Sequence, residues 1–371
     1  MPFDIPFIRP RFPDSAIIGH DFDEIVASNW YTNFGPRERR FSAAIADYVG
    51  EGFHAVTFSN ATLGLMAVLQ ATLGRGDGTR YVLVPSFTFA AGPEAIEWAD
   101  FRPLFIDVDP ESLQPSLHDA RAAVAAHEVV GILLCNTFGI GNPAIAEWEA
   151  FADEHGLPLV VDSAAGFGSR YPRGDRVGTA GIAEVFSFHA TKPFAIGEGG
   201  AVVTRDEALA AELASFQNFG FREGRGAFSL GLNGKLQEIN AAIGLRQLEQ
   251  FDDALGRRQG VLESYRSKLA HLPIRFPTAI ELSSVCFATV LLEDKAARDG
   301  ALERLTAASV EARTYYSPAV HRHPYFASAA RANDLTVTDV VIDTVLSLPV
   351  YEIMDTATID RIVAAIAGED S

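Results

Sequence analysis

Short apolar runs alternate with helical stretches between about residues 53 and 205, and this alternation restricts the fold more than any other feature of the chain. Continuous apolar strands separated by helices are typical of a mostly parallel sheet that is covered by helices on both faces. The expected strands are residues 54–58, 81–84, 103–107, 129–134, 159–162, 185–187 and 200–204. The sequence therefore predicts an α/β fold built on a large, mostly parallel, seven-stranded sheet.

Helical periodicity fills the gaps between these strands, in ATLGLMAVLQATLG, AAGPEAIEWA, LHDARAAVAAH and PAIAEWEAFADEHG. A long helical region follows over about residues 235–269, and the pattern changes after Pro273. Strand-like VCFATVLL and EARTYY, a helix near KAARDGALERLTAA and two terminal helices then predict a smaller α/β domain. We expect an N-terminal arm over 1–13, a large domain over 14–250 and a small C-terminal domain over 251–371.

The net charge of −18 argues against nucleic-acid binding, because contact with a phosphate backbone requires clustered lysine and arginine. A small phosphorylated ligand remains compatible with this charge, since a few backbone amides and one cation can hold it. The N-terminus MPFDIPFIRPRFPD lacks the apolar stretch of a signal peptide, and no apolar run approaches the roughly 18 residues of a membrane helix. We therefore expect a cytoplasmic protein that binds neither nucleic acid nor membrane.

The two cysteines, Cys135 and Cys286, lie in the unrelated apolar runs GILLCNTF and SVCFATV. Buried, reduced thiols are their expected state, because no CxxC spacing links them. The nine histidines show no HExxH pattern, and HRH at 321–323 lacks partner ligands at zinc spacing. No metal site is predicted.

The first candidate for chemistry is Asp162, which ends the apolar strand in LPLVVDSAAGFGS at 157–169. Ligands of open parallel sheets bind at the carboxyl ends of the strands, so this carboxylate is well placed to meet one. Aspartates at such positions also often cap a turn. Taken alone, Asp162 leaves both interpretations open.

The second candidate is FSNATLGLMAVLQ at 58–70, where a strand is followed by a turn and a helix start. Free amides and the helix dipole favour a phosphate there, with Thr62 able to add a hydroxyl. The simpler alternative is an ordinary N-cap formed by Ser59 or Asn60.

The third candidate is PSFTFAAGPEAI at 85–96, where Phe87 and Phe89 follow a strand on either side of Thr88. Strand alternation would put both rings on one face, where one ring would stack on a flat heterocycle. Core packing is the commoner role of a phenylalanine, since the chain contains 26 of them.

The fourth candidate is Lys192 in FSFHATKPFAIGEGG, which lies between a strand end and a glycine-rich turn. A lysine shielded from water becomes a usable amine nucleophile and forms Schiff bases with carbonyl compounds, including pyridoxal phosphate. A solvent-facing lysine in a loop is the ordinary alternative.

The combination is more specific than any of its members. A helix start suited to phosphate, an aromatic ring, a strand-end aspartate and a strand-end lysine follow one another on one parallel-sheet domain. Pyridoxal phosphate requires an anion cradle, a ring stack, a carboxylate for the pyridine nitrogen and an amine. The sequence therefore predicts this cofactor.

These residues lie within a wider resemblance to the DegT/DnrJ/StrS family of sugar aminotransferases, of pyridoxal-phosphate fold type I. The segment SFHATK…GEGG at 187–200 resembles the lysine signature of that family. The likeness extends through NWYTNFGP, FSNATLGL, VPSFTF, FIDVDPES, VVDSAAGFG, GLNGKLQEINAAIGLRQL, YYSPAVHRHPYF and LSLPVYEIM.

The resemblance implies a role for each candidate. Lys192 would form the Schiff base with the cofactor and shuttle the proton, and Asp162 would keep the pyridine nitrogen protonated. Phe89 would stack on the ring, and the phosphate would be bound by Ala61, Thr62 and Ser187.

The resemblance also implies a homodimer with shared active sites. GLNGK at 231–235 is similar to the segment that reaches into the neighbouring subunit, offering Asn233 and Lys235 as further cofactor-binding residues. His321, Arg313 and Asn33 are candidates for substrate binding, although His321 and Arg313 would equally well serve to complete the small domain.

Two positions depart from the family pattern. The family usually has Gln or His three residues after the aspartate, where this chain has Ala165, so the polar contact near the ring hydroxyl is missing or comes from elsewhere. Ala61 replaces the common glycine before Thr62, which leaves the backbone amide available.

The implied activity is transfer of an amino group, with glutamate as donor, to a nucleotide-linked 4-keto-6-deoxy sugar. Three alternatives remain: a 3-keto sugar aminotransferase, a sugar dehydratase, and a non-catalytic regulatory protein on the same scaffold. Dehydratases of this fold replace the lysine with histidine, so Lys192 disfavours that alternative.

Overall fold

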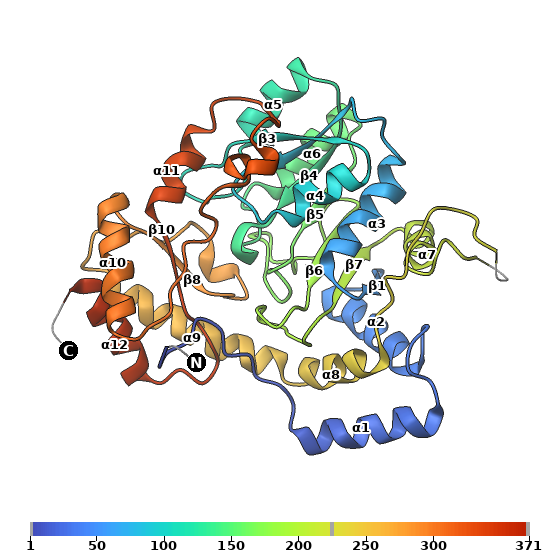
Figure 1. Ribbon diagram of the computed structural model, residues 1–371, viewed down its shortest axis with the longest axis horizontal. Coiled ribbons are helices and arrows are strands. Elements are labelled where there is room, and N and C mark those ends of the chain that lie inside the picture. Colours follow the sequence, from blue (N-terminus) through green and yellow to red (C-terminus); the bar gives the residue numbers. More distant parts are fainter. Residues whose placement is uncertain (1–2, 223–225, 369–371) are drawn as a thin grey trace.

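The computed structural model describes residues 3–222 and 226–368, and a sheet of eight strands runs through its centre (Figure 1). The strand order is β1-β7-β6-β5-β4-β2-β3-β9. The bounds are β1 His54–Phe58, β2 Tyr81–Pro85, β3 Arg102–Ile106, β4 Val129–Cys135, β5 Leu159–Asp162, β6 Ala183–Ser187, β7 Gly200–Thr204 and β9 Ala330–Arg331. β7 runs antiparallel to β1 and β6, and the remaining pairs are parallel. The predicted strands are confirmed, and β9 is added by the C-terminal part of the chain.

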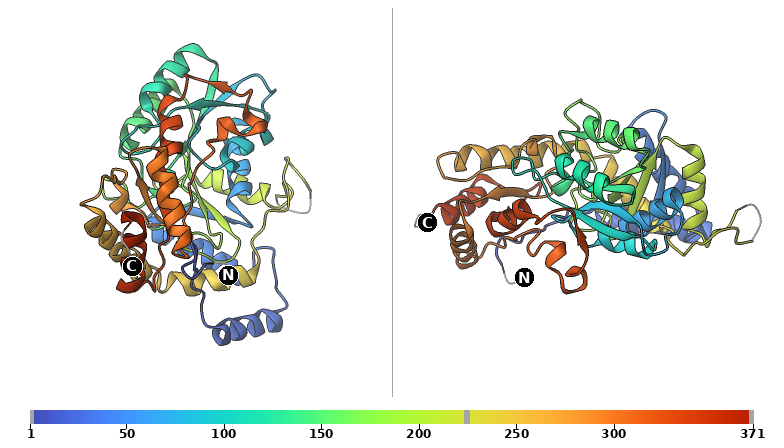
Figure 2. Two further views of the ribbon diagram at one scale, coloured as in Figure 1. Left: turned by 60° about the vertical axis from the view of Figure 1, so that its left-hand side comes forward. Right: turned by 90° about the horizontal axis from the view of Figure 1, so that it is seen from above.

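The strands are apolar along their length because their alternate side chains enter two different cores. On β2, Leu83 packs in one core, whereas Val82 and Val84 pack in the other. Helices α2, α5, α6 and α8 cover the first face, and α3, α4 and α7 cover the second, so that helices lie on both sides of the sheet (Figure 2). The bounds of the helices of this part are α1 Ser15–Ser28, α2 Pro36–Val49, α3 Ala61–Leu73, α4 Ala91–Trp98, α5 Leu117–Ala126, α6 Ile145–His155, α7 Glu207–Phe216 and α8 Glu238–Leu248.

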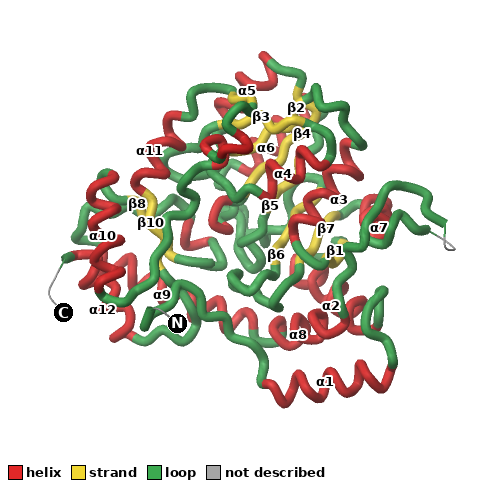
Figure 3. Tube along the Cα trace, viewed as in Figure 1, coloured by secondary structure: helices red, strands yellow, loops and turns green. Residues whose placement is uncertain are grey.

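The predicted helical region over 235–269 consists of α8 and a longer helix, α9 (Phe251–Leu269), with a break at residues 249–250. α9 leads from the large sheet to the C-terminal elements, where a two-stranded antiparallel sheet pairs β8 (Ala288–Leu291) with β10 (Val345–Leu348) (Figure 3). Three more helices belong to this part: α10 Lys295–Ala307, α11 Thr336–Thr344 and α12 Thr356–Ala367.

The prediction of a strand in EARTYY is wrong. Residues 311–316 form only an isolated bridge between Arg313 and Ser347. Beyond this bridge the chain turns toward the large sheet, where the Tyr316 ring stacks on that of Phe138 with the centroids 5.4 Å apart. Aromatic packing against another part of the molecule therefore ends the strand pairing after one residue.

Two segments of the chain pack against parts of the molecule that are distant from them in sequence. Ile5 and Phe7 of the N-terminal segment pack in the core of the C-terminal elements, and Ile5 forms a parallel bridge with Val310. Val320 and Phe326, in contrast, pack in the second core of the large sheet. The division of the chain into an arm and two domains stays a prediction. Across residues 3–222 and 226–368, no helix combines the length and the apolar character needed to cross a membrane.

Candidate active site

A cavity of about 580 Å³ opens beside the carboxyl ends of β5 and β6. Its walls come from the large sheet, from the C-terminal part through Tyr315 and Tyr316, and from the N-terminal segment through Phe7 and Ile8. The lining includes Ala61, Thr62, Phe89, Asp162, Ser187 and Lys192. The structure therefore brings together in one cavity six side chains that the sequence places up to 131 residues apart (192 minus 61).

Lys192 lies in the loop that joins β6 to β7. Backbone hydrogen bonds from Phe188 to Gly199 and from Ile196 to Phe188 hold the two arms of this loop together. The φ angle of +94° at Gly197 explains the glycine-rich sequence after the lysine, since this conformation is unfavourable for other residues. The buried rings of Phe188 and Phe194 pack at 5.1 Å and fix the loop to the core beneath it.

Asp162 ends β5 with its side chain 6% exposed. Burial raises the pKa of its carboxyl to about 6, against the opposing effects of the Ala164 amide and the positive charge of Lys192. The Ala164 N–H donates to one carboxyl oxygen at 3.1 Å. A protonated ring nitrogen of a bound ligand would stabilise the charged form of this carboxyl.

The start of α3 presents backbone donors to the same cavity. Asn60 does act as the N-cap, accepting from the Leu63 N–H at 3.0 Å, and this leaves the first-turn amides of Ala61 and Thr62 without an intrahelical acceptor. Gly200 on β7 lies so close that an added Cβ would be 2.6 Å from the Ala61 nitrogen. Capping and anion binding are therefore compatible at this helix start.

The expectation that Phe87 and Phe89 share one face is wrong. β2 ends at Pro85, so strand alternation does not extend to these residues. Phe87 is fully buried and packs edge-to-face against Phe138 at 5.6 Å, whereas Phe89 lines the cavity and is 64% exposed. Only Phe89 has a free ring face to offer a ligand.

These residues fit pyridoxal phosphate. The cofactor's phosphate suits the amides of Ala61 and Thr62 with the hydroxyls of Thr62 and Ser187, and its ring nitrogen suits Asp162. Its aldehyde requires an amine such as Lys192, whose charge acts on Asp162 and on both thiols of the cavity.

Several residues that line the cavity are not predicted from the sequence to do so. Both free cysteines line the cavity and are buried, as expected for reduced thiols, and burial raises the pKa of Cys135 to about 12. Cys135 ends β4 opposite Asp162, so the rule that places ligands at strand ends also points to it. His189 and Glu198, on facing arms of the lysine loop, lie 3.6 Å apart at the cavity wall. Ala165 lines the cavity without offering a polar group.

The remaining predicted residues lie elsewhere within this chain. Arg313 pairs with Glu311 and donates to the Tyr315 hydroxyl, and Asn33 is exposed in the loop before α2. The Lys235 amine donates to the Asn233 side chain at 2.7 Å, outside this cavity. His321 is 2% exposed and accounted for by contacts with Ser86 and Asp339, which favours its structural alternative.

The model of the family described as the DegT/DnrJ/EryC1/StrS aminotransferase family matches residues 15–367. Protein Rv3402c of Mycobacterium tuberculosis (strain ATCC 25618 / H37Rv) is 48% identical over 367 residues, covering 98% of this chain and 89% of the relative. The dTDP-4-amino-4,6-dideoxy-D-glucose transaminase of Escherichia coli is 27% identical over 373 residues, covering 98% of each chain. The crystal structure of DesI in the presence of its TDP-sugar product superposes with a TM-score of 0.89 at 35% identity, covering 99% of this chain and 94% of that one.

Proposed function

The chain belongs to the DegT/DnrJ/EryC1/StrS aminotransferase family, and we propose that it transfers an amino group to a nucleotide-linked keto sugar with pyridoxal phosphate as cofactor. One observation carries this proposal: the Lys192 amine, the buried Asp162 carboxylate and the free first-turn amides of α3 line a single cavity. The related E. coli enzyme is named as a transaminase of a dTDP-linked amino sugar, and DesI is described with a TDP-sugar product.

Each residue would contribute one part of the chemistry. Bound pyridoxal phosphate would supply an electron sink for the carbon that gains or loses the amino group. Asp162 would keep a proton on the ring nitrogen of the cofactor. The Phe89 ring would stack on the face of the cofactor ring. The Lys192 amine would take a proton from the donor carbon and return one to the sugar carbon, acting as a positioned general base and acid.

For the acceptor we propose a 4-keto-6-deoxy sugar, and for the donor glutamate. The SFHATK and GEGG segments resemble the branch of the family that aminates the fourth carbon, and the name of the E. coli relative describes a 4-amino-4,6-dideoxy sugar. Chromatography of the products formed from both keto isomers tests this choice. Exclusive use of the 3-keto isomer would reject it.

We further propose a homodimer in which the neighbouring subunit completes each site. Lys192 is the only lysine or arginine among the described residues that line the cavity. A donor with two carboxylates and a nucleotide diphosphate both require more positive charge than one lysine supplies. Asn233 is exposed and Lys235 half-buried in the segment before α8, which supports the proposal that they reach the site of a second copy.

The absorbance spectrum of the purified protein, before and after glutamate, tests the cofactor and the amino transfer together. We expect a visible band that bleaches with glutamate and returns with the keto sugar. Lys192→Ala should fold normally and lose turnover by about 10⁴-fold or more, because both proton transfers depend on this amine. A protein that binds the cofactor but exchanges no amino group with any donor would instead support a regulatory role.

A further inference from the structure

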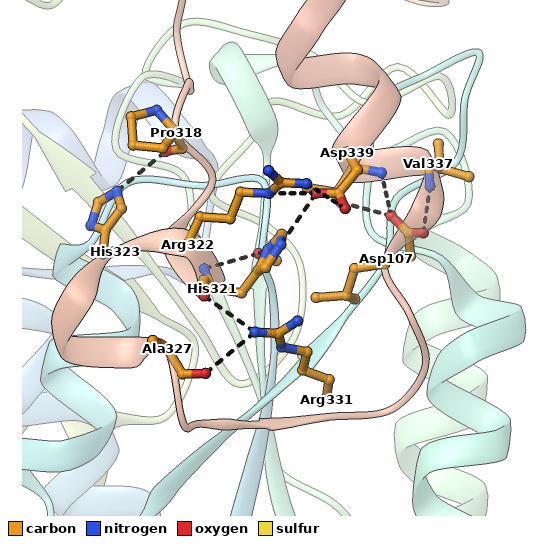
Figure 4. A network of polar contacts seen from close by, with 12 residues as sticks. Asp107, Pro318, His321, Arg322, His323, Ala327, Arg331, Val337 and Asp339 are labelled. Carbon is orange, nitrogen blue, oxygen red and sulfur yellow. Dashed lines mark hydrogen bonds and ion pairs between the residues drawn. The ribbon is translucent and has the colours of Figure 1, made fainter.

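His321 connects the C-terminal part of the chain to the end of β2 through a buried polar network (Figure 4). Its Nδ1 lies 2.6 Å from the Ser86 Oγ, and its Nε2 lies 3.2 Å from a carboxyl oxygen of Asp339. Ser86 follows β2 directly, His321 belongs to the short helix η3 (Val320–Arg322), and Asp339 belongs to α11. Three elements that are distant in sequence therefore meet at one imidazole ring.

The chemistry of the partners fixes the direction of these hydrogen bonds. The Asp339 carboxylate only accepts, so Nε2 carries the ring proton and Nδ1 of the neutral ring accepts from the Ser86 hydroxyl. Burial lowers the pKa of His321 while the charge of Asp339 raises it, and the neutral ring agrees with the net lowering. Arg322 pairs with the same carboxylate at 2.7 Å and holds it in place.

Ser86 is bound to the C-terminal part at its backbone as well as at its side chain. Its carbonyl accepts from the Val320 N–H at 3.1 Å, and its hydroxyl accepts from the His321 N–H at 3.3 Å. On the other side, Asp107 accepts from the backbone N–H of Val337 and Thr338 and thereby fixes the start of α11 (Figure 4). Hydrogen bonds to the backbone thus hold both Ser86 and the start of α11.

A Ser–His–Asp arrangement suggests a hydrolytic site, but burial excludes that use. Ser86 has no exposed surface, and its hydroxyl is occupied by His321 on both its donor and its acceptor side. Ser86 begins the turn that carries Thr88 and Phe89. Thr88, two residues on, donates to the Cys135 Sγ at 3.3 Å, and Phe89, three residues on, projects into the cavity.

We propose that His321 is a positioning residue that, through Ser86, sets where Phe89 lies against the cofactor ring. The inference rests on the proposed function for the identity of the ring and goes beyond it in assigning a buried histidine outside the cavity to the site. In this role the hydrogen bond from Ser86 to Nδ1 matters more than the charge of the imidazole. A side chain that preserves an acceptor at the position of Nδ1 should therefore preserve the site.

The test compares His321→Leu, which removes the acceptor, with His321→Asn, which retains one near the position of Nδ1. His323→Leu is the matched control, because His323 is half-buried and its ring contacts the Pro318 carbonyl at 3.2 Å rather than the Ser86 turn (Figure 4). Circular dichroism of the visible band reports how asymmetrically the bound ring is held. We expect a weaker signal per bound cofactor and a roughly tenfold higher Kd for pyridoxal phosphate in His321→Leu, with values near those of the unaltered protein in the other two variants.

A second readout needs no cofactor. The Cys135 thiol accepts from Thr88 of the turn after Ser86, whereas the Cys286 thiol donates to the Thr191 carbonyl of the lysine loop. The alkylation rate of each thiol in the cofactor-free protein, followed by peptide mass spectrometry, should rise for Cys135 alone in His321→Leu. This measurement remains informative even where the proposed activity fails, so the two hypotheses are separable.

Two outcomes would overturn the inference. One is an unchanged dichroism signal and an unchanged Cys135 rate in His321→Leu. The other is an equal acceleration of both thiols with a lower melting temperature, which would show general loosening rather than positioning. Where His321→Leu does not fold, Ser86→Ala breaks the same hydrogen bond with a smaller change of volume, and the same criteria apply to it.

Discussion

At the scale of the residue, two carboxyl groups on neighbouring strands differ in what surrounds them. Asp162 on β5 lines the cavity, whereas Glu184 on β6 is fully buried and satisfied by the protein itself. Glu184 accepts from the Tyr171 hydroxyl at 3.0 Å and from the amides of Gly178 and Ala180. Asp162 is thus the carboxyl that remains available to a ligand, and Glu184 serves to hold the segment before β6.

The protonation of Glu184 should make stability depend on pH. Burial raises its pKa from 4.5 to about 7, so the folded protein keeps this proton between those pH values while the unfolded chain releases it. This proton contributes at most about 3 kcal/mol to the free energy of unfolding. The contribution is complete below pH 4.5 and is lost as the pH rises to about 7. Urea unfolding from pH 4.5 to 8 should show this decline in the unaltered protein and a flatter profile in Glu184→Gln.

The control for this measurement is Glu303→Gln, at an exposed position on α10. Its profile should follow that of the unaltered protein. Equal slopes in Glu184→Gln and the unaltered protein would show that Glu184 does not titrate between pH 4.5 and 7. Burial also raises the pKa of Asp162, to about 6, and the pKa of Glu38, so both groups contribute in the same direction and leave a residual slope in Glu184→Gln.

At this scale the sequence predicts several of the residues that line the cavity, but it does not predict how they pack. Lys192, Asp162 and Thr62 line the cavity as the sequence leads one to expect, because a strand end fixes where the next residue lies. The choice between Phe87 and Phe89 depends on where β2 ends, and the sequence marks that point only approximately. The burial of His321 depends on contacts with Ser86, 235 residues away, which no local pattern reveals.

At the scale of the element, β7 and the start of α3 fit closely together in the site. A Cβ at Gly200 would meet the Ala61 nitrogen at 2.6 Å and the Phe186 carbonyl oxygen at 2.8 Å. Backbone atoms cannot rotate away as side chains do. Any residue other than glycine would therefore push the helix start away from the position that the phosphate requires.

Gly200→Ala should raise the Kd for pyridoxal phosphate by roughly tenfold or more and destabilise the fold by about 1–3 kcal/mol. Fluorescence titration with the cofactor and urea unfolding of the cofactor-free protein measure the two effects separately. Gly256→Ala is the control, since an added Cβ on α9 meets nothing within 4 Å and should raise helix stability slightly. A normal Kd in Gly200→Ala would mean that the helix start does not hold the phosphate.

The sequence predicts a strand well where both faces of the strand are buried. It predicts a strand poorly where only one or two residues pair with a neighbouring strand. β1, β5 and β7 have the predicted bounds because both of their faces enter apolar cores. β9 is only two residues long and follows no periodicity, so the sequence offers no sign of it. EARTYY has the composition of a strand, but its tyrosine rings find partners outside the small sheet.

At the scale of the whole molecule, an active site shared between two subunits predicts that two inactive variants complement each other. Lys192→Ala and Lys235→Ala should each be nearly inactive in the proposed dimer, the first for want of the amine and the second for want of a cation from the neighbour. Mixed and allowed to exchange subunits, they form dimers in which one of the two sites contains both lysines. Activity should then recover to about a quarter of that of the unaltered enzyme.

Light scattering establishes whether the protein is a dimer before the mixing experiment. Lys268→Ala serves as the control for loss of a lysine, because Lys268 pairs with Asp360 at the surface of the C-terminal part. Recovery with Lys192→Ala plus Lys268→Ala should not exceed the sum of the separate activities. No recovery with Lys235→Ala would place Lys235 outside the neighbouring site.

The N-terminal segment has a consequence for how the protein is made. The Asp4 N–H donates to the Ser309 hydroxyl, 305 residues away, and Phe7 and Ile8 close one side of the cavity. During synthesis, a ribosome must therefore add some 300 residues before this segment meets its binding partner. Until then, Ile5 and Phe7 remain on the nascent chain as exposed apolar residues that a chaperone can bind. The wall of the cavity that is translated first is thus among the last to be built.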